Sequence, residues 1–154
     1  MRIIPAVFPE DAATVRALFR AYLEGLGIDL GFQGIEAELA DLPGRYAPPS
    51  GTVLLARDAD GAAVGVVAMG PLSPGVVEMK RLYVSPAGRG RGLGRALAEA
   101  IIAAAREAGH ARMRLDTLET LAPALAIYAR LGFRPIENYN ASPLAGIRHF
   151  ELTL

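Results

Sequence analysis

The chain has 154 residues, and its 16 Lys and Arg residues balance 16 Asp and Glu residues, so the formal net charge is zero. Hydrophobic residues make up 52% and charged residues 21%, which excludes a disordered chain. Neutrality argues against a nucleic-acid partner, because nucleic-acid-binding domains are strongly basic. The sequence has no cysteine, which excludes disulfides, thiolate metal sites and a cysteine nucleophile. One domain, residues 1–154, is expected at this length.

The sequence also predicts the cellular location of the protein and whether it binds a membrane or a metal. Its N-terminus, MRIIPAVFPEDAAT, has no signal-peptide core, and no apolar run approaches membrane length. His110 and His149 lie too far apart in sequence to form a metal-binding motif. We therefore expect a cytoplasmic protein with no membrane partner and no metal.

The first half of the chain predicts a strand, a helix and then an antiparallel meander. Residues 2–8 form an apolar run in which Pro5 indicates an edge strand. Apolar residues then recur at helical spacing up to Leu26, and Gly25 and Gly27 should end this helix. Residues 28–51 are irregular apart from a short helix expected over 35–42. Strands are expected at residues 52–58, 62–70 and 76–84, with turns at Asp60-Gly61 and at 73–75.

The second half alternates helices and strands. A long amphipathic helix is expected from Leu93 to Gly109, followed by a strand at residues 111–117. A second helix opens near Pro123 and stops at Gly132, which are favoured positions for these residues. Two closing strands are expected at 133–137 and 147–154. This order predicts an α/β fold, a mixed sheet with helices on both faces.

One stretch between these halves, SPAGRGRGLGRAL at residues 85–97, concentrates glycine and arginine. A flexible linker, a nucleic-acid-binding arm and a phosphate cradle would each use such a composition. A linker does not fit, because an amphipathic helix follows at once. A P-loop does not fit, because Arg95 and Ala96 follow Gly94 where Lys and Ser or Thr are required. The alternating glycines also differ from the G-x-G-x-x-G spacing of dinucleotide-binding loops.

The remaining interpretation is a strand, a glycine-rich turn and a helix N-terminus that together bind an anion. Such a turn directs unpaired backbone N–H groups and the helix dipole at one small volume. Glycines allow a ligand to approach the backbone closely, and arginines add positive charge. A pyrophosphate has the right size for this site.

The sequence resembles the GCN5-related N-acetyltransferase (GNAT) superfamily. That family's pyrophosphate signature, Arg/Gln-x-x-Gly-x-Gly/Ala, is matched by Arg89, Gly92 and Gly94. RLYVSP at residues 81–86 is similar to the family's fourth strand, and ALAIYARLGF at 124–133 to its late tyrosine-bearing helix and the next strand. The resemblance implies a mostly antiparallel N-terminal meander with splayed central strands. It also implies an enzyme that moves acetyl from acetyl-CoA to a primary amine by direct attack in a ternary complex.

The resemblance further implies which residues contact coenzyme A. The strand before the glycine turn carries a bulge in the family, whose backbone binds the pantetheine arm and polarises the thioester carbonyl. The adjacent charges Lys80 and Arg81 fit such a bulge, because they break the in-out alternation of a strand, although an edge strand with two solvated charges is the alternative. A solvated arginine turn is the alternative for the glycine stretch. The expected cofactor-binding residues are Leu82, Tyr83, Val84, Arg89, Gly90, Arg91, Gly92, Leu93, Gly94, Arg95 and Tyr128.

Two catalytic residues follow from the same resemblance. Tyr128 lies where many members place the general acid that protonates the coenzyme A thiolate; the alternative is a core tyrosine on an apolar helix face. Glu78 lies where some members keep a glutamate that acts as the base through water; the alternative is a surface glutamate paired with a neighbouring arginine. Lesser candidates for the base are Glu119, Glu137, Tyr139, His149 and Glu151.

The sequence departs from the family pattern at one point. Many members have an asparagine one to two turns before the tyrosine, but Leu121 stands there, so Thr117 or Thr120 would have to replace that contact. The missing asparagine favours the alternative function, a non-catalytic coenzyme A-binding module. The resemblance is compatible with a homodimer.

The acceptor is expected to be a small-molecule amine or a peptide, contacted by loops at residues 28–51 and 138–146. Acidic groups there would receive a cationic amine, whereas Arg45 or Arg148 would receive a carboxylate. The polar residues of these loops are Asp29, Gln33, Glu36, Glu38, Arg45, Tyr46, Asn138, Tyr139, Asn140 and Ser142.

Overall fold

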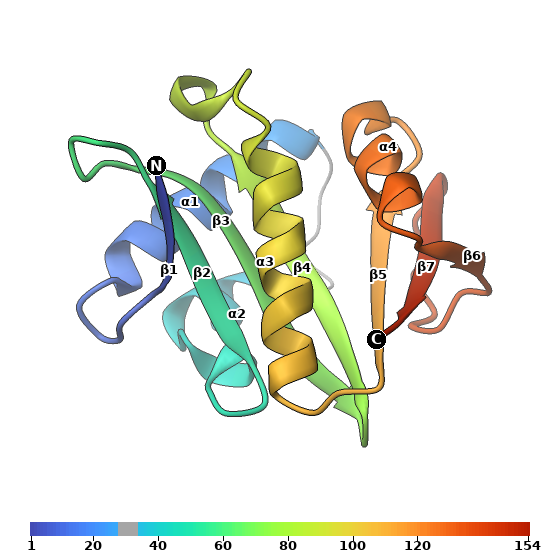
Figure 1. Ribbon diagram of the computed structural model, residues 1–154. Coiled ribbons are helices and arrows are strands. Elements are labelled where there is room, and N and C mark those ends of the chain that lie inside the picture. The colour runs from blue at the N-terminus through green and yellow to red at the C-terminus, as the bar shows by residue number, and fades with distance from the viewer. Residues whose placement is uncertain (28–33) are drawn as a thin grey trace.

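A mixed sheet with the strand order β1-β2-β3-β4-β5-β7-β6 organises the structure (Figure 1). The structure is a computed structural model and describes residues 1–27 and 34–154. The strands are β1 (Arg2–Pro5), β2 (Thr52–Arg57), β3 (Ala63–Ser73), β4 (Val76–Val84), β5 (Arg112–Leu118), β6 (Arg134–Ile136) and β7 (Ile147–Thr153).

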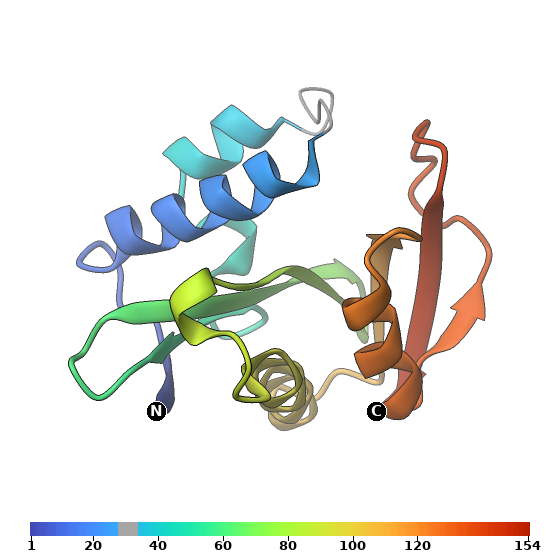
Figure 2. The ribbon, with the colours of Figure 1, turned by 90° about the horizontal axis from the view of Figure 1, so that it is seen from above.

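Helices cover both faces of this sheet, as expected from the sequence (Figure 2). On one face lie α1 and α2, and their side of the sheet holds a core that includes Val15, Phe19 and Leu55. On the other face, α3 and α4 pack over a second core that includes Leu97 and Ile101. The helices are α1 (Ala12–Leu26), α2 (Ile35–Ala40), α3 (Leu93–Glu107) and α4 (Ala122–Arg130), with 3-10 turns η2 (Gly44–Tyr46) and η3 (Pro86–Gly88).

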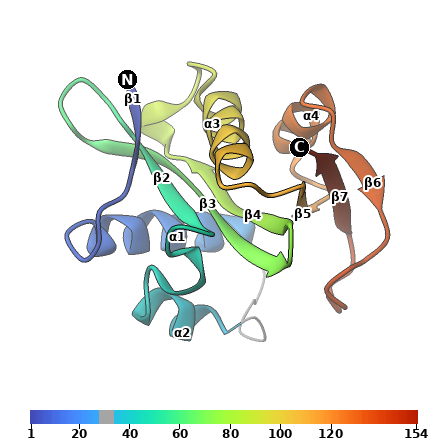
Figure 3. The same cartoon turned by 60° about the horizontal axis from the view of Figure 1, so that its bottom comes forward.

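The strands β2, β3 and β4 form the predicted antiparallel meander, and β1 pairs antiparallel with β2 at the sheet edge, as Pro5 indicated (Figure 3). The helix α1 continues through Gly25 to Leu26, so the prediction that Gly25 helps to end it is wrong. A single glycine weakens a helix by about 1 kcal/mol without stopping it. Gly27, with φ at 66°, forms the left-handed cap.

The sheet changes character between β4 and β5, which pair in parallel. Their register joins only Val76, Val77 and Glu78 to Arg112, Met113 and Arg114. Beyond Glu78 the two strands have no paired residues, although β4 continues to Val84 and β5 to Leu118. The expected splay of the central strands is therefore present, and it leaves one edge of β4 without a partner strand.

The strand β4 also contains a bulge in the part that is separated from β5. Opposite β3, Val66 pairs with Tyr83 while Ala68 pairs with Lys80, so β4 has one residue more than β3 across this step. Arg81 lies within it and has φ at 61°, a left-handed conformation that costs a non-glycine residue about 1–2 kcal/mol. The alternative of an edge strand with solvated charges is wrong, because β4 is central and Arg81 is buried.

Within the described part of the chain, none of the helices combines the length and the apolar composition that crossing a bilayer would require.

Candidate active site

The glycine-rich stretch forms a turn between β4 and α3. Gly92 is the N-cap of α3 with φ at 68°, and no side chain caps this helix end, so backbone N–H groups of its first turn face outward. A Cβ at Gly92 would meet no atom within 4 Å, whereas one at Gly88 would lie 2.9 Å from the Val64 carbonyl oxygen. Gly88 thus lets the turn pack on the sheet, and Gly92 keeps the helix end open.

A groove of about 430 Å³ lies over this turn, between α3 and α4. Most of the predicted pyrophosphate residues line it, but Arg91 is exposed and does not. Arg89 folds back, and its Nε donates a hydrogen bond to the Val84 carbonyl at 3.2 Å. The lining residues are Val84, Gly88, Arg89, Gly90, Gly92, Leu93, Gly94, Arg95, Pro123, Ala126, Ile127 and Arg130.

A smaller recess of about 50 Å³ lies where β4 and β5 separate. The side chains of Leu82 on β4 and Tyr128 on α4 line it, together with Thr117 from β5. Leu121 and the exposed Thr120 do not, so of the two threonines considered in place of the missing asparagine only Thr117 reaches this recess. The Tyr83 side chain packs on the α1 side, 6.3 Å from the Tyr22 ring, which leaves only its backbone near the splay.

Tyr128 is both a core residue and a wall of this recess. It is only 6% exposed, and its ring contacts Phe133 edge to face with centroids 5.6 Å apart. Burial raises the pKa of Tyr128 above its ordinary value of 10.0, with smaller contributions from Tyr22 and Asp116. Among the described residues its hydroxyl takes part in none of the side-chain hydrogen bonds. Within the described part of the chain, this hydroxyl is thus a protonated donor without a fixed acceptor.

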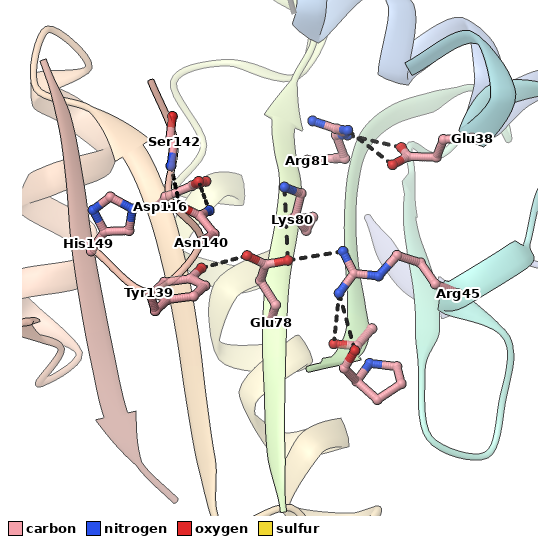
Figure 4. Close-up of polar contacts among 12 residues, drawn as sticks. Glu38, Arg45, Glu78, Lys80, Arg81, Asp116, Tyr139, Asn140, Ser142 and His149 are labelled. Carbon is pink, nitrogen blue, oxygen red and sulfur yellow. Dashed lines mark hydrogen bonds and ion pairs between the residues drawn. The ribbon is translucent and has the colours of Figure 1, made fainter. Parts of the chain in front are cut away.

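Glu78 lies near the point where the pairing of β4 with β5 ends, and it is only 3% exposed (Figure 4). One carboxylate oxygen accepts a hydrogen bond from Arg45 Nη1 at 3.0 Å and lies 3.9 Å from Lys80 Nζ. The other accepts a hydrogen bond from the Tyr139 hydroxyl at 2.5 Å. The alternative of a surface glutamate is therefore wrong, and its arginine partner is 33 residues away.

Tyr139 is held in place from the β7 side. Its ring meets His149 edge to face at 5.2 Å, and the Arg114 guanidinium lies 5.6 Å from the ring centroid. His149 shares a hydrogen bond of 3.0 Å with Asn140 Oδ1, while Asn140 Nδ2 donates to Asp116 at 2.6 Å. Burial, followed by the neighbouring Glu78 carboxylate, raises the pKa of Tyr139, which keeps its hydroxyl a donor.

A second groove of about 350 Å³ opens beside Glu78. Arg81 and Lys80 line both this groove and the recess at the splay, so the two are adjacent. Arg81 makes a bidentate ion pair with Glu38, with both N–O distances at 3.1 Å. The lining residues are Glu38, Arg45, Leu72, Glu78, Lys80, Arg81, Asn140 and Ser142.

The structure separates the remaining candidates from this centre. The Glu151 carboxylate pairs with Arg114 at 2.8 Å, and neither Glu119 nor Glu137 lines one of the three recesses. The exposed Arg148 lies over the Phe150 ring at 5.9 Å. Exposed Glu36 pairs with Arg20 at 3.2 Å. Asp29 and Gln33 lie outside the described residues.

A sequence profile for the acetyltransferase (GNAT) family matches residues 15–133, which is more than half of the chain. The chain belongs to this family. As a GNAT protein it is an acyltransferase, in agreement with its relatives. It is 42% identical over 147 residues to an uncharacterized N-acetyltransferase of Schizosaccharomyces pombe, and the match covers 95% of this chain and 90% of that one.

Solved structures agree with the GNAT fold. An acetyltransferase of the GNAT family from Staphylococcus aureus superposes with a TM-score of 0.81 at 19% identity, and 99% of this chain and 98% of that one are covered. The yncA protein of Salmonella typhimurium, whose structure contains its cofactor acetyl-CoA, superposes with a TM-score of 0.76 at 23% identity, covering 99% and 92%. These similarities establish the fold of the GNAT domain.

Several residues of these recesses were not singled out by the sequence. Arg130 lines the glycine-turn groove with Pro123 and Ile127, and their i, i+4 and i+7 spacing on one helix face was the available signal. Lys80 was noted only for interrupting the strand pattern. Arg45 was considered for a carboxylate ligand, but its contact with Glu78 joins η2 to β4 and has no local signal.

The hydrogen bond from Tyr139 to Glu78 should contribute measurably to stability. Tyr139→Phe removes one donor from a buried carboxylate, and we expect a loss of about 1–3 kcal/mol in the free energy of unfolding by urea. Tyr46→Phe is the matched control, because the buried Tyr46 hydroxyl has no hydrogen-bond partner in the described part of the chain. Equal effects of the two substitutions would show that the Tyr139 contact stabilises nothing.

Proposed function

We propose that the protein is an N-acetyltransferase that uses acetyl-CoA and transfers its acetyl group directly to a primary amine in a ternary complex. One observation supports this most strongly: three recesses follow one another along β4. The first includes Val84, the second Leu82, and the third shares Lys80 and Arg81 with the second. An extended ligand that starts at the glycine turn can therefore reach Glu78 by following one strand.

The glycine turn is proposed to hold the pyrophosphate of coenzyme A. The uncapped first turn of α3 offers N–H donors, and the open side of Gly92 leaves room for phosphate oxygens. Arg89, Arg95 and Arg130 supply positive charge around the groove. The exposed Arg91 can add charge only from outside it.

The splay is proposed to hold the pantetheine arm. Beyond Glu78 the β5-facing edge of β4 has no partner strand, so the backbone groups of Leu82, Tyr83 and Val84 on this edge are available to a ligand, except that the Val84 carbonyl already accepts a hydrogen bond from Arg89. The bulge turns this part of β4 out of regular pairing with β3. Backbone N–H groups fixed in this way can also polarise a thioester carbonyl without reorganising.

Acetyl-CoA supplies an activated thioester; the reaction forms a bond from the amine nitrogen to the acetyl carbon and breaks the carbon–sulfur bond. Glu78 is proposed to receive the ammonium proton through a water molecule. Each of its oxygens already accepts a hydrogen bond, but a carboxylate oxygen can accept a second one. Tyr128 is proposed to protonate the departing thiolate, and the second proton, which the acylated nitrogen loses, restores the Tyr128 hydroxyl. Because burial raises the pKa of Tyr128, this hydroxyl still carries its proton when the thiolate forms.

The glycine turn provides the first test. Gly92→Glu places a carboxylate and a side chain at the open helix end, so acetyl-CoA binding measured by calorimetry should be lost. Gly61→Glu is the matched control, because Gly61 also has a left-handed φ, 84°, and open space around a Cβ, but lies in the β2–β3 turn. Retained binding by the Gly92 variant would remove the pyrophosphate assignment.

Tyr128 provides the second test. Tyr128→Phe should lower kcat by about 10²- to 10⁴-fold, the usual contribution of a general acid, while acetyl-CoA still binds. Because burial raises the pKa of Tyr128, the protonated form persists beyond pH 10.0. The wild-type pH–rate profile should therefore show no loss of activity from Tyr128 ionisation below that pH. A Tyr128→Phe variant with full turnover would show that Tyr128 contributes only to packing and is not the general acid.

A further inference from the structure

The positively charged side chains that line the second groove, beside Glu78, differ in how many hydrogen-bond acceptors they contact. Arg81 is matched by Glu38, and Arg45 by Glu78 and by the carbonyl oxygens of Gly70 and Pro71 at 3.4 Å (Figure 4). Lys80 is different. Its ion-pair contact within the described part of the chain is Glu78 at 3.9 Å, which is too long for a hydrogen bond.

The Lys80 side chain is mostly covered by its neighbours, but it is not fully buried. Its side chain is only 13% exposed, and among residues 1–27 and 34–154 no protein acceptor lies within hydrogen-bond distance of its ammonium. In the described part of the chain, the Tyr46 hydroxyl is the buried side-chain polar atom that lacks a partner, so the Lys80 ammonium instead reaches the groove, where its three donors are available to a ligand. The lining of the groove contains three cations, Arg45, Lys80 and Arg81, against the two carboxylates of Glu38 and Glu78. The surplus positive charge is the one at Lys80.

The charges of Glu78 and Lys80 also have a defined arrangement in space, in addition to the excess positive charge of the groove. They lie two residues apart on β4, so their side chains emerge on the same face with a carboxylate and an ammonium 3.9 Å apart. An α-amino acid carries the opposite pattern. Its ammonium and carboxylate are attached to one carbon and lie roughly 3 Å apart. The two pairs can therefore align side by side with each charge opposite its counter-charge.

On this basis we propose that the acceptor is a free α-amino acid, an inference that rests on the proposed acetyltransferase function. Lys80 binds the substrate carboxylate, and Glu78 faces the amine that is acetylated. Polyamines would add positive charge beside Lys80 and Arg45. A peptide N-terminus has an amide where Lys80 requires an anion, so both classes leave the ammonium unmatched.

The test compares matched acceptors that differ only at the carboxyl group: an α-amino acid, its α-amide and the corresponding amine without the carboxyl carbon, for several side chains. Coenzyme A release is followed with a thiol reagent, to which the cysteine-free chain contributes no signal. The value of kcat/KM should be at least about tenfold higher for the amino acid, as expected for one charge-assisted hydrogen bond.

Variants assign this preference to one side chain. Lys80→Met should bring the amino acid to amide ratio close to one, and Lys80→Arg should retain part of it. Arg112→Met is the matched control, because Arg112 is an exposed cation on β5 outside all three recesses, and the ratio should not change.

Each other outcome contradicts one of the two claims. A wild-type enzyme that acetylates the amide or the amine as well as the amino acid overturns the amino-acid inference and leaves the acetyltransferase function in place. A Lys80→Met variant that keeps the preference also overturns it. No coenzyme A release with any acceptor, while acetyl-CoA binds, contradicts the proposed function itself.

Discussion

The short pairing of β4 with β5 is the constraint on which the rest of the site depends. Three residue pairs, ending at Glu78 and Arg114, hold the two halves of the sheet together. Had the pairing continued along β4, β5 would occupy the space that Leu82, Thr117 and Tyr128 now surround. The same separation leaves backbone groups of β4 free, which a continuous sheet would satisfy internally.

Interactions on both sides of β4 maintain this separation. Arg81 adopts a left-handed conformation that costs about 1–2 kcal/mol, and its guanidinium is fixed by a bidentate pair with Glu38. Removing one partner would leave a buried charge unpaired, which typically costs about 3–5 kcal/mol. Near the end of the pairing, Glu78 is held by Arg45 from η2 and by Tyr139 from the segment before β7. The splay is thus a supported feature, and not a loose region of the sheet.

The sequence could indicate the parts of the candidate site whose signals are local. The glycine turn, the helix that follows it, and Tyr128 on a helix that begins near Pro123 and ends before Gly132 each occupy a short continuous stretch. The bulge was also indicated locally, by adjacent charges at Lys80 and Arg81. What could not be predicted are the contacts that cross long stretches of chain: Arg45 with Glu78 spans 33 residues and Tyr139 with Glu78 spans 61. That the Lys80 ammonium has no acceptor among residues 1–27 and 34–154 becomes clear only when those contacts are known.

A crystal structure with coenzyme A would test the central claim, that one ligand follows β4 from the glycine turn to the splay, most directly. The pyrophosphate oxygens should lie about 2.7–3.2 Å from backbone nitrogens of residues 89–95. The pantetheine arm should lie in the opening between β4 and β5, with its sulfur beside the Tyr128 hydroxyl. Coenzyme A bound elsewhere, or with its pantetheine arm outside the splay, would contradict the claim.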